Sequence, residues 1–107
     1  MSYSIRFTKS AVKDLQETTD YIDYVLLNPQ ASDHLLDLLD HEIRHLTDYP
    51  YSHQLVSDTF LNSQGIRFIT VGNYIAFYKI DESSRLVTII RFLYGKRDWL
   101  TILREEK

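Results

Sequence analysis

The stretch Arg85–Leu103, RLVTIIRFLYGKRDWLTIL, decides the fold that this sequence predicts. Its first half alternates bulky apolar residues as a strand does, and Gly95 ends the pattern. Two basic residues, Lys96 and Arg97, follow, and Asp98 opens a short helix. A buried strand therefore carries Lys96 and Arg97 to its end, where they serve chemistry, binding or only the sheet.

The composition predicts a single globular domain covering residues 1–107. Apolar residues make up 44% of the chain and charged residues 25%, which is far from the signature of disorder. No run approaches the roughly 18 apolar residues of a membrane span, and the N-terminus lacks the build of a secretory signal. The absence of cysteine excludes disulfides and thiol nucleophiles. We therefore expect a cytoplasmic protein without a membrane partner.

The net charge of −3 conceals an uneven distribution. Residues 1–50 carry four bases against nine acids, which gives 4 − 9 = −5. Residues 51–107 carry eight bases against six acids, which gives 8 − 6 = +2. The uniform basic field that is usual for a nucleic-acid binder is absent, although a local basic face is still compatible with the sequence.

Two amphipathic helices are predicted in the first half of the chain. The first begins at Thr8 or Ser10 as its N-cap and ends at Asn28–Pro29, which also start the second. The second helix runs to about Tyr49, because Pro50 stops it. Helices joined by so short a connection form an antiparallel hairpin, and its apolar face needs a sheet to cover.

Four strands complete the predicted fold, which is α+β in the order β-α-α-β-β-β-α. Residues 51–64 have weak periodicity and many Ser, Asp and Asn residues, so we expect a surface loop there. Tight turns at Gly72–Asn73 and Asp81–Ser84 join the last three strands into an antiparallel meander, and the first strand joins an edge. The sheet is thus mostly antiparallel and packed by the helical hairpin. Its strands are expected at residues 2–7, 66–71, 74–80 and 86–93.

One motif suggests a metal site. Residues 41–45 match H-E-x-x-H, which in zinc peptidases places two ligands and a general base on one helix face. At 100° per residue, however, His41 and His45 fall on the solvent side of the predicted helix, opposite Leu39. A catalytic zinc needs a third ligand and a walled cleft. His53 is a possible ligand, but no extended metzincin pattern follows the motif, since Asp48 and Tyr51 stand where Gly and His would be. We therefore expect no metal and no cofactor, with a metallopeptidase as the least favoured alternative.

An ordered series of short motifs runs along nearly the whole chain. It comprises Phe7 and Ala11 before Asp14-Leu15, then Tyr21-Ile22, Asn28-Pro29, a leucine-rich helix closing at Pro50, Gly65-Ile66-Arg67, Val71-Gly72-Asn73-Tyr74, Phe77–Asp81 and Arg91–Trp99. The series resembles the RelE/ParE superfamily of bacterial toxins. The resemblance implies a type II toxin–antitoxin module, in which the C-terminal segment of a cognate antitoxin wraps and silences this protein.

The superfamily divides by mechanism. RelE-like members act with the ribosome and cleave mRNA through its 2′-hydroxyl, whereas ParE-like members are linked to poisoning of DNA gyrase. By resemblance to RelE-like sequences, Arg67 fills a basic position on the second strand and Arg97 matches the arginine after the last strand. The expected third-strand arginine falls on Ile75, and the expected C-terminal tyrosine falls near Leu103. These two departures argue against RNA cleavage.

Physical chemistry favours the same interpretation. Cleavage through a 2′-hydroxyl needs a proton acceptor, a proton donor and cations. Arg67, Lys96 and Arg97 supply cations, but no histidine follows His53 and no tyrosine follows Tyr94. A ParE-like toxin acting on DNA gyrase is therefore the favoured function. A RelE-like, metal-independent mRNA endoribonuclease using Arg67 and Arg97 is the alternative, and an inactive binding module is the third.

Four residues are candidate contacts for a partner. Lys96 and Arg97 follow the last strand and offer positive charge. Tyr74 and Tyr78 share one face of a strand, where they could stack on a base, although packing is the simpler role. Trp99 is expected to anchor the last helix on the sheet.

Overall fold

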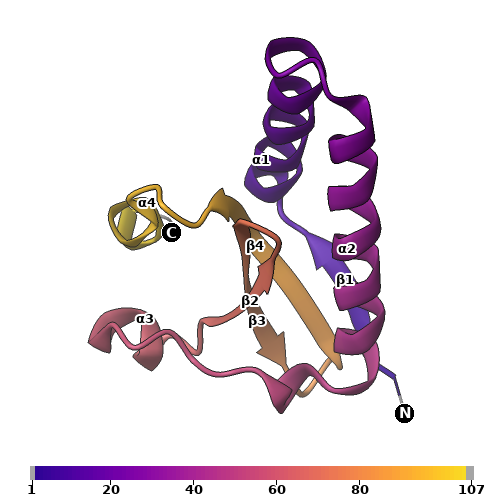
Figure 1. The fold of residues 1–107 in the computed structure, drawn as a ribbon. Helices are drawn as coiled ribbons and strands as arrows, with labels where there is room; N and C mark the ends of the chain where they lie inside the picture. The colour runs from indigo at the N-terminus through magenta and orange to yellow at the C-terminus, as the bar shows by residue number, and fades with distance from the viewer. Residues whose placement is uncertain (1, 106–107) are drawn as a thin grey trace.

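The computed structural model describes residues 2–105 (Figure 1). The predicted order is confirmed, with one further short helix, α3, before the second strand. The prediction of a loop over residues 51–64 is therefore wrong in part. Helix α3 was not predicted, because its five residues are too few to show a periodic pattern. The elements are β1 Ser4–Phe7, α1 Lys9–Asp20, the π-helix η1 Tyr21–Val25, α2 Pro29–Asp48, the 3₁₀-helix η2 Pro50–Ser52, α3 Thr59–Ser63, β2 Arg67–Val71, β3 Tyr74–Asp81, β4 Leu86–Tyr94 and α4 Trp99–Glu105.

The four strands form one sheet in the order β1-β4-β3-β2. The three strands of the meander are antiparallel, whereas β1 joins the edge of β4 in parallel, with Ser4 opposite Leu86. The expected α+β fold with a mostly antiparallel sheet is confirmed. β4 is the organising strand, because it pairs with both β1 and β3.

The helical hairpin follows from two capping side chains. The Thr8 side chain accepts a hydrogen bond from the backbone N–H of Ala11, which makes Thr8, rather than Ser10, the N-cap of α1. The Asn28 side chain accepts one from Ala31, and Pro29 occupies the first turn of α2. The hairpin and its tight connection are thus specified locally.

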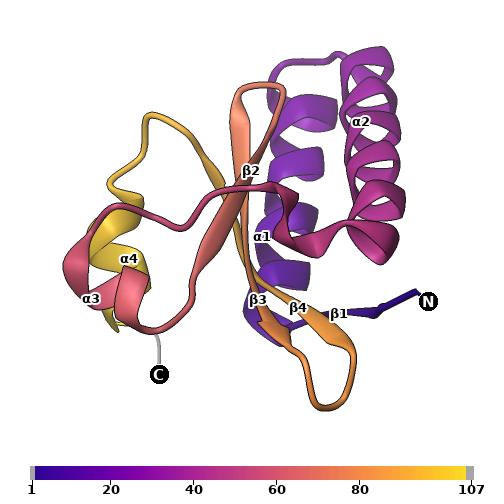
Figure 2. The same cartoon turned by 90° about the horizontal axis from the view of Figure 1, so that it is seen from below.

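The two faces of the sheet are covered by different helices. Figures 1 and 2 show α1 and α2 over one face and α3 with α4 over the other. The larger core lies under the hairpin, and its sheet side is formed by Tyr78, Val87, Ile89 and Phe92 among others. On the opposite face Trp99 packs against Phe77 with ring centroids 5.1 Å apart, as predicted for the anchor of α4.

A β-bulge interrupts the pairing of β3 with β4. Phe77 lies opposite Arg91 and Tyr78 lies opposite Ile89, so Ile90 is an extra residue on β4. The extra residue shifts the alternation of side chains along the strand. Arg91 consequently reaches α1, while Phe92 still enters the core under the hairpin.

The lengths and compositions of the helices can be compared with what a membrane span requires. None of the helices between residues 2 and 105 combines the length and the apolar character that a bilayer span requires.

Candidate functional site

A cavity of about 640 Å³ opens between the connection of the hairpin and the end of β4. Helical residues form one wall, and the ends of β3 and β4 with the loop before α4 form the other. Its lining is mostly aromatic and aliphatic, with a few charged groups at the rim. The lining residues are Asp14, Glu17, Thr18, Tyr21, Ile22, Leu26, Ala31, Asn73, Tyr74, Phe92, Leu93, Tyr94 and Arg97.

Arg97 is the unpaired cation of this cavity. Its backbone is fixed, because its N–H donates to the Tyr94 carbonyl at 3.0 Å and its own carbonyl accepts from Trp99 at 2.7 Å. Its side chain is exposed and makes no hydrogen bond or ion pair with any other residue between 2 and 105. Lys96 is exposed next to it. The loop thus fixes the backbone of Arg97 and leaves its exposed guanidinium available to a ligand.

Of the two tyrosines predicted on β3, Tyr74 lines the cavity. Its ring stacks on Phe92 with centroids 5.3 Å apart and meets Tyr94 edge to face at 5.5 Å. Burial raises the pKa of Tyr74, so its hydroxyl stays protonated near neutral pH. Tyr21 and Tyr94 lie in the same lining and are about half exposed. Tyr94 was not among the residues predicted to contact a partner, although its place at the end of the strand alternation was a signal that the sequence offered.

Tyr78 does not lie in this site. It is fully buried, and its hydroxyl donates a hydrogen bond to the Pro50 carbonyl at 2.7 Å. Burial raises the pKa of Tyr78 to about 12. A contact between Tyr78 and a partner is therefore not supported, because the side chain belongs to the core although it shares a strand face with Tyr74.

Arg67 lies toward the other end of the sheet. Its Nη1 donates to the His53 carbonyl at 2.6 Å, and its guanidinium lies 5.1 Å from the centroid of the Tyr51 ring. It pairs in register with Tyr78, which is four residues along β3 from Tyr74, or about 13 Å at strand spacing. The structure therefore does not bring Arg67 and Arg97 together, and Arg67 holds the segment before α3 against the sheet.

A buried ion pair lies beneath the rim of the cavity. Both Asp14 carboxylate oxygens accept from Arg91, at 2.6 Å from Nε and 2.7 Å from Nη2. The backbone N–H of Phe92 donates to the same carboxylate at 3.0 Å. The pair thus ties α1 to β4 in a bidentate geometry. Asp14 and Arg91 each stand in one of the family motifs, but no local pattern in the sequence shows that residues 77 positions apart meet.

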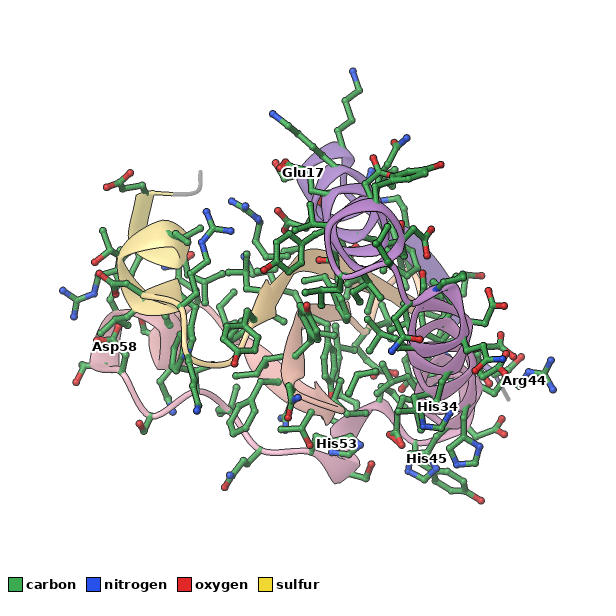
Figure 3. All side chains as sticks on the ribbon, turned by 45° about the horizontal axis from the view of Figure 1, so that its top comes forward. Glu17, His34, Arg44, His45, His53 and Asp58 are labelled. Carbon is green, nitrogen blue, oxygen red and sulfur yellow. The ribbon has the colours of Figure 1, made fainter. Side chains whose placement is uncertain are left out.

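The carboxylates on α1 give the cavity a mixed charge. Asp14 and Glu17 line the cavity together with Arg97, and Figure 3 shows Glu17 extending from α1. Asp14 is compensated by Arg91, whereas Glu17 is exposed. A phosphodiester bound at Arg97 would thus approach a carboxylate on the facing wall.

The hairpin connection forms an exposed apolar surface next to the cavity, here termed the apolar tip. A regular α-helical period continued through the predicted first helix to Asn28 would bury Val25 and Leu26 on its apolar face, and this expectation is wrong because both side chains are exposed. The π-helix η1 adds a residue to the turn, so a 100° periodicity fails there. The apolar tip comprises Tyr21 (50% exposed), Tyr24 (75%), Val25 (63%), Leu26 (55%) and Leu27 (77%).

The charged side chains of the helical segments that flank the apolar tip have a single sign, opposite to that of Arg97 across the cavity. Residues 14–43 contain eight acids and no lysine or arginine. Monomeric proteins rarely expose contiguous apolar side chains on this scale unless a partner covers them. The combination therefore indicates a protein-binding surface.

The H-E-x-x-H motif lies away from this site. Figure 3 shows His45 and His53 at the opposite side of the molecule from Glu17. The His45 and His53 rings are 5.8 Å apart, and burial lowers the pKa of His53. Between residues 2 and 105, no three His, Cys, Asp or Glu side chains are grouped so that they could hold a metal ion.

Solved structures place this architecture among toxins of toxin–antitoxin systems. The chromosomal ParDE system from P. aeruginosa is similar with a TM-score of 0.68 and 16% identity, covering 88% of this chain and 97% of that one. The RelBE2 toxin–antitoxin complex from Mycobacterium tuberculosis gives 0.60 and 21%, covering 88% and 99%. The intact E. coli RelBE complex gives 0.59 and 14%, covering 89% and 99%. At these identities the likeness establishes the fold alone.

The sequence itself identifies the family. A family model described as the ParE toxin of type II toxin-antitoxin system, parDE, matches residues 5–99. The protein therefore belongs to this family of type II toxins, and the resemblance to the RelE/ParE superfamily is confirmed. No curated protein matched the sequence.

Proposed function

We propose that this protein is a growth-inhibiting toxin that poisons DNA gyrase in the cytoplasm and is neutralised by a cognate antitoxin. The observation that carries the choice of target is the separation of Arg67 from Arg97. Arg67 is bonded to the His53 carbonyl at one end of the sheet, and Arg97 projects at the other. The two cations that an RNA-cleaving centre would share thus lie in different places.

The groups around Arg97 also argue against proton transfer at neutral pH. An RNA-cleaving site needs a base that accepts the 2′-hydroxyl proton and an acid that protonates the leaving oxygen. Tyr74 has a raised pKa, which makes it a poor base, and the exposed Glu17 carboxylate would repel the scissile phosphate. This arrangement supports a binding site rather than a nuclease centre.

A ribosome-dependent mRNA endoribonuclease is the second candidate. It is supported by the unpaired Arg97 guanidinium beside Tyr74 and Tyr94, because aromatic rings can stack on exposed bases. In that case Arg97 would bind the phosphate without the help of Arg67. An inactive module that only holds a partner is the third candidate, and the growth assay below distinguishes it.

The antitoxin is proposed to cover the apolar tip and the adjoining cavity. The similar structures from P. aeruginosa and Mycobacterium tuberculosis are described as a toxin–antitoxin system and a toxin–antitoxin complex. Large apolar side chains beside a cavity provide the anchor sites that protein interfaces use. A partner segment with apolar and basic residues fits the apolar, acidic hairpin.

Three measurements test the proposed function. Induced expression without antitoxin should stop growth, and unchanged growth with accumulation of folded protein would leave only the inactive module. Purified protein should inhibit supercoiling by purified gyrase, or trap cleaved plasmid. Toeprinting on translating ribosomes should show no cleavage of mRNA in the A site. Cuts that appear with the wild-type protein and disappear with Arg97→Ala would instead favour the mRNA endoribonuclease over the gyrase poison.

A further inference from the structure

A second surface lies on the sheet face that α3 and α4 cover only in part. Figure 2 shows the turn between β3 and β4 extending past both helices. Two hollows of about 470 and 300 Å³ lie there and share the residues Thr8, Lys79 and Ile90. They form one groove across β1, β4 and β3, here termed the open-face groove. It shares no residue with the cavity beside Arg97.

Two cations lie in a row across the floor of this groove. The register places Arg6 of β1 opposite Thr88 of β4, and Thr88 opposite Lys79 of β3. Since neighbouring strands are about 4.8 Å apart, the backbones of Arg6 and Lys79 are separated by about 10 Å. Neither side chain makes a hydrogen bond or an ion pair with another residue in the described part of the chain. Two unpaired positive charges therefore face the same groove.

The acids at the end of the groove are already satisfied. Asp81 accepts hydrogen bonds from the backbone and hydroxyl of Ser83 at 3.1 and 2.8 Å. Glu82 accepts from the hydroxyls of Tyr3 and Tyr51 at 2.7 and 2.8 Å and pairs with Arg85. Glu82 is compensated by Arg85, whereas Asp81 keeps its charge because its donors are neutral. Arg6 and Lys79 together therefore still outweigh Asp81, and the groove keeps an excess of positive charge for carboxylates from outside.

The other half of the groove is apolar. Leu61, Ile66 and Leu103 are buried at its base, and Phe60 is 49% exposed at its edge. Such a hollow accepts an aliphatic or aromatic side chain. The groove therefore combines an apolar pocket with a pair of cations, which is the lining that a mixed acidic and apolar peptide requires.

We propose that the open-face groove binds an acidic, extended segment of the antitoxin, with its carboxylates on Arg6 and Lys79 and an apolar side chain beside Phe60. In an extended segment, residues two positions apart point to the same side and are about 6.6 Å apart, within reach of both flexible cations. This inference rests on the proposed function, because it takes the antitoxin as the partner. It assigns the antitoxin a second, oppositely charged contact besides the hairpin.

A protein segment fits this groove better than a nucleic acid. Phosphate backbones bind through many cations at once, whereas this groove offers two, in a chain with a net charge of −3. Its apolar half also contains a single aromatic side chain, Phe60, on which a base could stack. The experiment below therefore also measures binding of a single-stranded oligonucleotide as the alternative.

The test measures binding of the protein encoded by the adjacent small open reading frame to the purified full-length chain. Combined Arg6→Glu and Lys79→Glu should weaken this binding by about 100-fold, because two charge pairs become repulsive. Phe60→Ala should weaken it by about tenfold. Arg44→Glu is the matched control, with the same change of charge near the C-terminal end of α2. Figure 3 shows Arg44 on the opposite side of the molecule from Asp58, the N-cap of α3, and this variant should leave binding near wild type.

The outcomes separate the groove from the proposed function. Growth inhibition should persist in the Arg6 and Lys79 variants, since neither residue lies in the cavity beside Arg97. If these variants bound the antitoxin as tightly as Arg44→Glu does, the groove proposal would be wrong and the proposed function would stand. Absence of any complex with the wild-type chain would overturn the antitoxin partner as well. Loss of binding to a labelled single-stranded oligonucleotide, with antitoxin binding intact, would reassign the groove to nucleic acid.

Folding of the variants is checked by circular dichroism and urea unfolding. Should Lys79→Glu fail to fold, Arg6→Glu and Lys79→Gln are measured singly, because Arg6 is exposed on the edge strand and glutamine keeps a long polar side chain at position 79. Each is expected to weaken antitoxin binding by about tenfold. Wild-type affinity in both single variants would contradict the proposal.

Discussion

Arg91 and Arg97 are six positions apart and face the same helix, yet they belong to regions of opposite character. In the seam between α1 and β4, Arg91 is bonded to the buried Asp14 carboxylate. At the rim of the cavity, Arg97 is held by its backbone, while its side chain has no partner among residues 2–105. A buried charge must be paired for the fold to be stable, whereas an exposed unpaired charge costs little. The seam thus serves folding, and the rim is available to partners.

The largest expected effect comes from breaking the seam. Asp14→Ala removes the acceptor of Arg91 and of the Phe92 N–H, so we expect a loss of about 3–5 kcal/mol in the free energy of unfolding. Urea unfolding measures it, with Asp40→Ala as control, because Asp40 forms an exposed pair with Arg44 on α2. Similar stabilities of the two variants would mean that the seam is not a structural ion pair.

Tyr78→Phe tests whether Tyr78, at the end of the sheet away from the cavity, also contributes to the stability of the fold. The change leaves the Pro50 carbonyl without its donor and should lower the free energy of unfolding by about 1–3 kcal/mol. Tyr94→Phe at the cavity rim should have little effect. A Tyr78 variant as stable as wild type would show that water replaces the lost donor.

The same residue predicts a pH dependence. The folded-state pKa of Tyr78 is raised from 10.0 to about 12, so the folded state holds this proton more tightly than the unfolded chain. Its stabilising contribution is complete below pH 10 and is lost as the pH rises toward 12. The stability difference between wild type and Tyr78→Phe should therefore shrink between pH 9 and pH 11.5 in urea unfolding, and a constant difference would contradict the raised pKa.

Arg97→Ala addresses the rim directly. Stability should stay near wild type, because the side chain has no partner in residues 2–105. Antitoxin binding, measured by calorimetry, should weaken by about tenfold. Arg97→Lys should recover part of the affinity through its charge. If Arg97→Ala lowered stability but left antitoxin affinity unchanged, Arg97 would serve the fold, as Arg91 does, and not a partner.

The smallest effect concerns the apolar tip. Leu27 has a positive φ of 53°, a conformation that disfavours residues with a branched side chain. Leu27→Asn should therefore raise stability by up to about 1 kcal/mol, because asparagine tolerates this backbone and Leu27 is 77% exposed. Antitoxin binding should weaken at the same time. Leu26→Asn, at an ordinary φ, is the control and should weaken binding without the gain.

The predictable part of the fold was the part with local signals. Asn28 and Pro29 mark the hairpin connection by capping chemistry, and Gly72 with Asn73 marks the turn between β2 and β3. The five-residue α3 and the π-helix η1 were missed, because one is too short for a periodic pattern and the other changes the period. Sequence pattern therefore gave the order of elements and missed the apolar tip.

The candidate site was less predictable because it depends on register. Arg97 was selected from the sequence and lies at the cavity, whereas Arg67 and Tyr78 were selected on strand position and lie elsewhere. The bulge at Ile90 and the pairing of strands decide which side chains meet, and neither has a local signal. Arg6 and Lys79 become neighbours only through Thr88 on a strand between them.

β4 lies inside the sheet but near the end of the sequence, and this delays assembly of the sheet during protein synthesis. β1 and α1 are made first, but their partners on β4 emerge some 80 residues later, as with Asp14 and Arg91. Until then the hairpin has no complete sheet to pack on, and β1 has no neighbour. The sheet of a newly made chain can thus be completed only after β4 has been synthesised, near the end of translation.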